Sequence, residues 1–378
     1  MKTHQILFFS FFFIILFGSC EKKPYATGPD IYVEDTDFKV VGYLSRGGFR
    51  HIDNLELDKL TYLNLAFGNP DINGNLVFSG NTDIKPVVKK GHEAGLKVFV
   101  SLAGGGRPDT TIWKSVLSPE KRSVFIKGIL DYVSENELDG VDVDIEGNLL
   151  PYIGDLYTPF VLELRDALHA RGKGITTALG ATRVHEAVTQ ESLFAYDFIN
   201  VMVYDKTGIW RPDDIGPHSP FSYAVDAIKY WNEVRMIPLD KIILGLPFYG
   251  FDFTPPARYI NYKEIIKDQV ELAFQDSTGM RYYNGIPMIS RKTQLAKEML
   301  GGVMIWEISC DTLQSDLSLM RAMDQTIKAG DCDVRTFYKD EDGDGLGDPS
   351  HPIQACDAPA GYVDNRIDED PASEEEIQ

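Results

Sequence analysis

The chain has 378 residues and a formal net charge of −20 at pH 7. This length suffices for one barrel-sized domain or two smaller ones, and the acidity argues against nucleic acid and anionic membrane surfaces as partners. The charge is uneven: residues 331–378 carry 15 acids and 3 bases, a net of −12, which leaves −8 for everything before them. The acidity therefore belongs largely to a C-terminal tail.

The first 20 residues are typical of a targeting segment. A basic start precedes an apolar run at residues 6–17, which is too short to span a bilayer but suits a signal peptide. Gly18 and Ser19 lead into Cys20, which resembles a bacterial lipoprotein signal, so we expect Cys20 to be lipidated. The expected location is the outer membrane or cell surface, with secretion as the alternative. Residues 21–37 are polar and indicate a linker.

A strand–helix alternation follows the linker and fills residues 38–330. One helix is expected to open at Ser118–Pro119–Glu120, where a capping serine precedes a proline, and a closing helix at residues 313–329. Eight alternating units predict an α/β fold, a (β/α)8 TIM barrel. A doubly wound sheet is the alternative, but no Gly-x-Gly-x-x-Gly follows the first strand. The predicted strands are 40–44, 62–67, 96–102, 138–147, 174–179, 198–204, 242–247 and 302–306.

The fourth predicted strand places three acids, Asp142, Asp144 and Glu146, on one face, alternating with apolar residues on the other. Buried carboxylates are costly unless paired, metal-bound or protonated, and crowding raises their pKa values. Glu146 is the last of the three, at the end of the strand where a parallel barrel keeps its active site, so it is the candidate general acid. A solvated edge strand and a divalent-metal site are the rival interpretations, but no further ligands for a metal lie nearby in the sequence.

Residues 139–146, Asp-Gly-Val-Asp-Val-Asp-Ile-Glu, resemble the DGxDxDxE signature of glycoside hydrolase family 18, the chitinases and endo-β-N-acetylglucosaminidases. Four more segments extend the resemblance over the whole barrel. They are Ser101–Gly105, similar to SxGG with Ala103 where Gly is commoner, Met202–Asp205, which matches MxYD, Leu244–Gly250, and Gly302–Trp306.

The resemblance implies hydrolysis of β-1,4 bonds next to N-acetylglucosamine without a cofactor for catalysis. In this family the substrate's own 2-acetamido oxygen attacks the anomeric carbon, with net retention. Glu146 would then be the acid and base, Asp144 would orient the acetamido group, and Asp142 would share a proton with Asp144 in one coupled titration. Tyr204 completes the catalytic set. The predicted substrate-binding residues are Asp205, Met202 and Trp306. Tyr43, Trp210 and Tyr249 fall at or just after strand ends, where they either line outer subsites or pack between loops.

Three further expectations concern the surroundings of this site. Ser101, Gly104 and Gly105 should shape the turn after the third strand and support Asp142, while His185 and His218 are expected at the surface. The interval between the seventh and eighth strands has only about fifty residues, so the insertion that many relatives carry there is predicted to be shortened, irregular and aromatic-rich. A shallower cleft and endo-acting cleavage follow from that.

The expected partner is an oligo- or polysaccharide that contains N-acetylglucosamine, and we expect a monomer. Chitin oligomers are the leading substrate, which makes the chain chitinase-like. Endo-β-N-acetylglucosaminidase action on N-glycan cores is the alternative. A catalytically silent glycan-binding protein is a third hypothesis, because some members of the family have lost the acid.

The tail, residues 331–378, is predicted to be a small irregular acidic segment. Acids at Asp340, Asp342, Asp344 and Asp348, with Gly345 between them, have the spacing of an oxygen-rich loop that binds Ca²⁺. Pro349 and Pro352 argue against the helix of an EF-hand. The segment better resembles thrombospondin type 3-like calcium repeats, with a disordered acidic tail as the alternative. Cys332 with Cys356 is the favoured disulfide.

Overall fold

The computed structural model describes residues 32–105, 108–267, 269–329, 335–340, 343, 345–355, 358 and 361–365. The predicted signal segment with Cys20, the Cys332–Cys356 pair, Asp342 and Asp344 lie outside the described residues. Within the described ranges, no helix combines the length and the apolar character needed to cross a bilayer.

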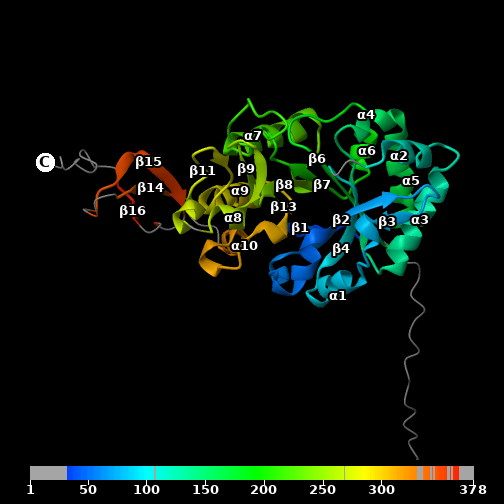
Figure 1. Ribbon diagram of the computed structural model, residues 1–378, viewed down its shortest axis with the longest axis horizontal. Helices are drawn as coiled ribbons and strands as arrows, with labels where there is room; N and C mark the ends of the chain where they lie inside the picture. The colour runs from blue at the N-terminus through cyan, green and yellow to red at the C-terminus, as the bar shows by residue number, and fades with distance from the viewer. Residues whose placement is uncertain are drawn as a thin grey trace, which may run out of the picture.

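Eight parallel strands close into a barrel, as predicted (Figure 1). The strands pair in chain order, and β1 closes the ring by pairing with both β2 and β13. A short strand, β3 (Leu76–Phe78), adds to β2 in the antiparallel direction. The barrel strands are β1 (Lys39–Ser45), β2 (Tyr62–Pro70), β4 (Lys97–Ala103), β5 (Gly140–Asp144), β6 (Gly174–Gly180), β7 (Phe198–Met202), β8 (Ile242–Pro247) and β13 (Gly302–Trp306).

Helices fill the connections between these strands. One predicted boundary is wrong: the helix expected at Ser118 begins at Arg122, because the amides of Lys121 and Arg122 both donate to the Ser118 carbonyl and form a separate turn. The helices are α1 (Lys85–Glu93), α2 (Thr110–Val116), α3 (Arg122–Glu135), α4 (Leu149–Ile153), α5 (Tyr157–His169), α6 (Gln190–Phe194), α7 (Phe221–Lys229), α8 (Tyr262–Ile265), α9 (Ile286–Met299) and α10 (Leu319–Lys328).

Two apolar layers follow from the alternation of side chains along each strand. Val141 and Val143 of β5 point outward into the large core between strands and helices. Tyr62, Phe99 and Phe198 lie instead in a second cluster inside the barrel. Because alternate residues of a strand face opposite sides, the polar residues between these outward-facing valines lie inside the barrel.

The interval between β8 and β13 is more regular than predicted. Its residues form a four-stranded antiparallel sheet in the order β10-β9-β12-β11. The strands are β9 (Tyr249–Asp252), β10 (Arg258–Asn261), β11 (Ser277–Thr278) and β12 (Arg281–Tyr282). The aromatic residues of this interval pack on one another, as in the stacked pair Tyr249 and Tyr259, whose ring centroids lie 4.6 Å apart. Ring packing and strand pairing thus order a segment that has no strong sequence signal.

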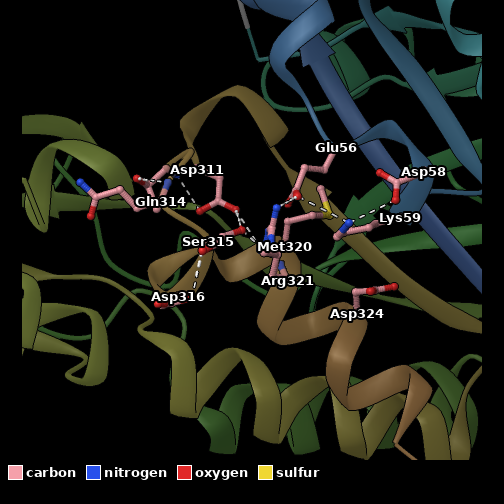
Figure 2. Close-up of polar contacts among 12 residues, drawn as sticks. Glu56, Asp58, Lys59, Asp311, Gln314, Ser315, Asp316, Met320, Arg321 and Asp324 are labelled. Atoms are coloured by element: carbon pink, nitrogen blue, oxygen red, sulfur yellow. Dashed lines mark hydrogen bonds and ion pairs between the residues drawn. The ribbon is translucent and has the colours of Figure 1, made fainter.

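The closing helix begins six residues later than predicted, at Leu319. Figure 2 shows the polar cluster that fixes its start. The Asp311 carboxylate accepts hydrogen bonds from the amides of Leu319 (3.1 Å) and Met320 (2.9 Å), and the Ser318 side chain caps the helix. Arg321 of α10 pairs with Glu56 at 2.5 Å, next to the 3-10 helix η2 (Leu57–Lys59). Residues 313–318 are therefore drawn into the cap and its loop.

The described end of the linker packs against the amino-terminal ends of the strands. The Tyr32 ring stacks on His169 with 3.9 Å between ring centroids. The Asp35 carboxylate accepts hydrogen bonds from Tyr62 Oη at 2.9 Å and Lys97 Nζ at 2.8 Å, and these two residues are the first of β2 and β4. The chain thus enters the barrel at the end opposite to the carboxyl ends of the strands.

The described part of the tail forms a small sheet, which corrects the prediction of an irregular segment. Its strands are β14 (Arg335–Lys339), β15 (Asp348–Ala355) and β16 (Tyr362–Val363), in the antiparallel order β15-β14-β16. β15 holds Pro349 and Pro352 and is an edge strand, where proline is tolerated because one row of amides is unpaired.

Candidate active site

Strand register places a ring of polar side chains inside the barrel. Asp142 on β5 is level with Ser101 on β4 and Thr176 on β6. Parallel neighbours in register point to the same side, so all three side chains meet in the barrel interior. The prediction that Ser101 supports Asp142 is confirmed, because Ser101 Oγ donates to Asp142 Oδ2 at 2.6 Å.

Asp142 has no solvent exposure and is held by four donors from four strands. Buried acids of this kind persist because the hydrogen bonds offset the loss of hydration. Burial raises the pKa of Asp142, and the four hydrogen bonds act in the opposite direction. Besides Ser101, the donors are Tyr43 Oη (2.7 Å), Thr176 Oγ1 (2.8 Å) and Asn200 Nδ2 (3.3 Å).

Asp144 is buried in a different manner, because its Oδ1 has no hydrogen-bond partner among the described residues. Burial, followed by the charges of Glu146 and Asp142, raises the pKa of Asp144 well above its usual range. This shift favours the protonated form of Asp144. The expected sharing of a proton between Asp142 and Asp144 stays a prediction, while the hydrogen bonds that Asp142 accepts come from hydroxyl and amide groups.

Glu146 lies just beyond the end of β5 and is partly buried. Burial and the charge of Asp205 raise the pKa of Glu146 to about 7. Gly105 leaves room for its carboxyl group, since a Cβ there would lie 3.0 Å from Glu146 Oε1. The result is an acid that carries its proton at mildly acidic pH and can give it up, as general acid catalysis requires.

A cleft of about 710 Å³ opens beside Glu146 over the carboxyl ends of β5, β6 and β7. Met202, predicted to bind substrate, is in its wall. Apolar residues form part of the lining, while Arg183, His185 and Glu186 supply polar groups.

Tyr204 and Asp205 come two and three residues after the end of β7, at the same end of the barrel as Glu146. Tyr204 is buried, with its Oη 3.7 Å from Met304 Sδ. Burial is the main cause that raises the pKa of Tyr204, and the charges of Asp144 and Asp205 act in the same direction. Asp205 has a positive φ of 60° and accepts a short hydrogen bond from Tyr249 Oη. This turned backbone carries the Asp205 carboxylate away from the strand direction.

Trp306 ends β13 at the mouth of the barrel and is partly buried. Its ring stacks on Phe67 with 5.6 Å between centroids and 19° between planes, and it contacts Tyr43 at 5.7 Å. Gly104 has a φ of 68°, and a Cβ at that position would lie 2.3 Å from the Phe67 ring. Glycine at 104 is thus needed to let Phe67 support the tryptophan.

A family model described as "Glycosyl hydrolases family 18" matches residues 39–311, which include every residue of the site above. The chain belongs to glycoside hydrolase family 18. Among solved structures, the family 18 chitinase ChiB from the chitin utilization locus of Flavobacterium johnsoniae is 39% identical, with a TM-score of 0.73 over 78% of this chain and 94% of that chain. A chitinase from Bacteroides thetaiotaomicron is 27% identical, with a TM-score of 0.67 over 77% of this chain and 97% of that chain.

Among curated proteins, a chitinase-like effector of Moniliophthora roreri is 32% identical over 221 residues, 52% of this chain and 54% of that protein. The chain spans about half the length of the first curated relatives it matches. Membership of family 18 supports glycoside hydrolysis of chitin-type substrates and binding of N-acetylglucosamine oligosaccharides.

Two residues that were predicted to line outer subsites, Tyr43 and Tyr249, lie elsewhere in the structure. Tyr43 is buried inside the barrel, where it donates to Asp142, and Tyr249 is buried with its hydroxyl on Asp205. Neither side chain is open to a sugar, because ring packing covers both. Trp210 is 52% exposed beside Phe251, so its assignment to an outer subsite stays a prediction.

Sequence reasoning missed four polar residues near the site. Thr176 and Asn200 had a usable signal, since both are inward-facing polar residues on otherwise apolar strands. His218 was predicted at the surface but is 1% exposed, and Lys292 on α9 is fully buried. Their burial depends on contacts between distant segments and has no local pattern.

The described part of the tail holds two of the four predicted calcium ligands, Asp340 and Asp348. Asp340 accepts hydrogen bonds from the amides of Gly343 (2.8 Å) and Gly345 (3.1 Å), as in a tight acidic loop. The described residues include no group of three or more His, Cys, Asp or Glu side chains placed to hold a metal ion. Calcium binding stays a prediction.

The first testable prediction concerns pH. Glu146 is the expected acid, a role that requires its proton. Since burial and Asp205 raise its pKa to about 7, kcat/KM should fall about tenfold per pH unit above pH 7. Asp205→Asn removes the neighbouring charge and should move this alkaline limb down by about one unit. The check is kcat/KM on a fluorogenic chitobioside between pH 4 and 9, with Asp226→Asn on the exposed face of α7 as control. An unmoved limb in Asp205→Asn contradicts the electrostatic link.

Proposed function

We propose that this protein hydrolyses β-1,4 bonds of chitin oligomers by a retaining, substrate-assisted mechanism. One arrangement carries the proposal: Glu146, whose pKa is raised to about 7, stands at the mouth of the cleft, and the buried Asp144 two residues before it has no hydrogen-bond partner for its Oδ1 among the described residues. The similar chitinase structures from Flavobacterium johnsoniae and Bacteroides thetaiotaomicron support the choice of substrate.

The 2-acetamido oxygen of the bound sugar attacks the anomeric carbon while Glu146 protonates the departing glycosidic oxygen. An oxazolinium ion forms, the bond to the leaving sugar breaks, and Glu146 becomes a carboxylate. That carboxylate then takes a proton from the water that opens the ring, which restores the acid and retains the anomeric configuration.

The other residues position the reacting groups. In its carboxylate form, Asp144 accepts the acetamido N–H at Oδ1 and stabilises the positive charge that develops on the acetamido group. Tyr204 and Asp205 hold the acetamido group in its attacking pose, and Trp306 forms a flat floor for the sugar ring. Such positioning supplies several kcal/mol of the barrier reduction.

Two alternatives have support of their own. The cleft over β5, β6 and β7 leaves space for a branched leaving group, which favours an endo-β-N-acetylglucosaminidase that acts on N-glycan cores. A silent glycan-binding protein is the other, because relatives carry the name chitinase-like effector. The intact Glu146 and Asp144 favour an active enzyme.

Mass spectrometry of products from chitohexaose mixed with a high-mannose glycoprotein separates these functions, and ¹H NMR of the new anomeric centre tests retention. Chitobiose and chitotriose released as the β-anomer would support the proposal. A glycoprotein trimmed to single N-acetylglucosamine stubs would instead support an endo-β-N-acetylglucosaminidase. Binding of chitohexaose without cleavage of either substrate would overturn the proposed hydrolysis and support a silent glycan-binding protein.

We also propose lipidation at Cys20, attachment to the outer membrane or cell surface, and calcium binding by the tail. Since the acids of the barrel need no metal, a chelator should leave kcat on chitin oligomers within about 20% of its untreated value, while the tail loses protection against a protease. Limited proteolysis with and without EDTA, alongside the activity assay, checks both parts. Loss of all activity with chelator contradicts the separation of tail and barrel.

A further inference from the structure

The Asp205 carboxylate faces a buried histidine that the mechanism above does not use. His218 Nδ1 lies 3.7 Å from Asp205 Oδ1, the same oxygen that accepts the Tyr249 hydroxyl. Neither ring nitrogen of His218 has a hydrogen-bond partner among the described residues. A buried N–H without a partner costs about 1–3 kcal/mol. An approach of roughly half an ångström would bring Asp205 into hydrogen-bond range, and its side chain, 44% exposed, has room to move.

A fully buried lysine fixes the position of this histidine. Lys292 Nζ donates to the carbonyl and hydroxyl oxygens of Ser219, both at 2.6 Å, and to Asn284 Oδ1 at 2.7 Å. Ser219 follows His218 in the chain, and its hydroxyl donates in turn to the Val203 carbonyl, just before Tyr204 and Asp205. One amino group, whose pKa burial lowers to about 7, thus joins α9, the loop after β7 and the insertion. Its hydrogen bonds hold both sides of the contact between His218 and Asp205.

Burial disfavours the charged form of the His218 imidazole. Burial is the main cause that lowers its pKa, and Lys292 on α9 adds to it, while Asp205 on the loop after β7 and the backbone of Tyr249 on β9 act in the opposite direction. The rings of Tyr249 and Phe251 cover the imidazole at 5.0 and 5.1 Å between centroids. A neutral ring carries one N–H, which can be donated to a carboxylate without cancelling its charge.

We propose that His218, held by Lys292, is a positioning residue that orients Asp205 through a ring N–H and thereby sets the acidity of Glu146. The inference rests on the proposed function, because it concerns the same acid. Asp205 raises the pKa of Glu146 through its charge. A donor behind Asp205 moderates that charge and keeps the carboxylate turned toward the substrate.

Enzyme kinetics test this proposal with two substitutions of His218 in the wild type, one of which is repeated in the Asp205→Asn variant. His218→Phe keeps a flat ring without the N–H, while His218→Gln keeps a neutral donor. We expect His218→Phe to lower kcat/KM about tenfold and to shift the alkaline limb upward, because the charge of Asp205 then acts on Glu146 without moderation. His218→Gln should stay within about threefold of the wild type. In the Asp205→Asn background, His218→Phe should cost less than about twofold, since residues that act through one another are not additive.

Equal losses from His218→Phe in both backgrounds, with no shift of the limb, would overturn the proposal and leave a packing role. So would a loss in His218→Gln as large as in His218→Phe while both variants melt like the wild type.

An NMR measurement keeps this test independent of the function. Two-bond ¹H–¹⁵N spectra of the full-length protein resolve the tautomer of each of its seven histidines. We expect His218 to be neutral with a proton on Nδ1 from pH 6 to 8, and its ¹⁵N shifts to change in Asp205→Asn. If the ¹⁵N shifts of His218 are the same in Asp205→Asn as in the wild type, the contact between His218 and Asp205 is refuted. If the wild type cuts no substrate, the proposed function fails, and these spectra still decide the contact.

Discussion

Glu146→Gln should lower kcat on chitin oligomers by at least about 10³-fold and leave their binding within a few-fold. Glutamine has the shape of glutamate and fits the space beside Gly105, but it cannot supply the proton to the leaving oxygen. Steady-state kinetics and calorimetry with chitotetraose measure the two effects.

The matched control is Glu186→Gln, because Glu186 lines the same cleft but is exposed. It should keep kcat within about threefold, since this exposed carboxylate is not one of the three acids on the inward face of β5 and its end. Activity of Glu146→Gln within tenfold of the wild type would show that another group supplies the proton.

Asp142→Ala should reduce the free energy of unfolding by about 3–5 kcal/mol, the largest stability effect we expect from a single site residue. The change leaves buried donors from Tyr43, Thr176 and Asn200 without their acceptor and opens a cavity inside the barrel. Urea denaturation, followed by tryptophan fluorescence, measures the loss.

Two milder variants calibrate this result. Asp142→Asn keeps one acceptor oxygen and the volume, so we expect a loss of about 1–2 kcal/mol, and Ser101→Ala removes a single donor and should cost about 1 kcal/mol. A loss under 1 kcal/mol for Asp142→Ala would contradict the view that this carboxylate organises the barrel interior.

The barrel and the acids could be predicted because their information is local. Alternating residues on β5 fix which carboxylates face inward, and the order of strands and helices fixes a closed parallel sheet. Glu146 follows from its place at the strand end. The start of α10 could not be predicted, because Asp311, eight residues upstream, takes the first amides of that helix.

The insertion and the network of Lys292 escaped prediction for a related reason. Four short strands with two to four residues each carry little periodic signal, and they form because distant aromatic rings pack together. Lys292 lies at an apparently ordinary helix position, and only the packing of α9 on the loop after β7 buries it. Tyr43 was assigned to the substrate because strand-end tyrosines often face a cleft, but its ring points inward to Asp142.

The docking of Tyr32 and Asp35 at the amino-terminal ends of the strands bears on how the enzyme meets its substrate. If Cys20 carries a lipid as proposed, the number of residues between Cys20 and Tyr32 limits the distance between the bilayer and the amino-terminal end of the barrel to roughly 40 Å. The open end would then point away from the bilayer. An enzyme held in this way would act on polymers that arrive from the surroundings. The cell's own envelope would lie behind it, out of reach of Glu146.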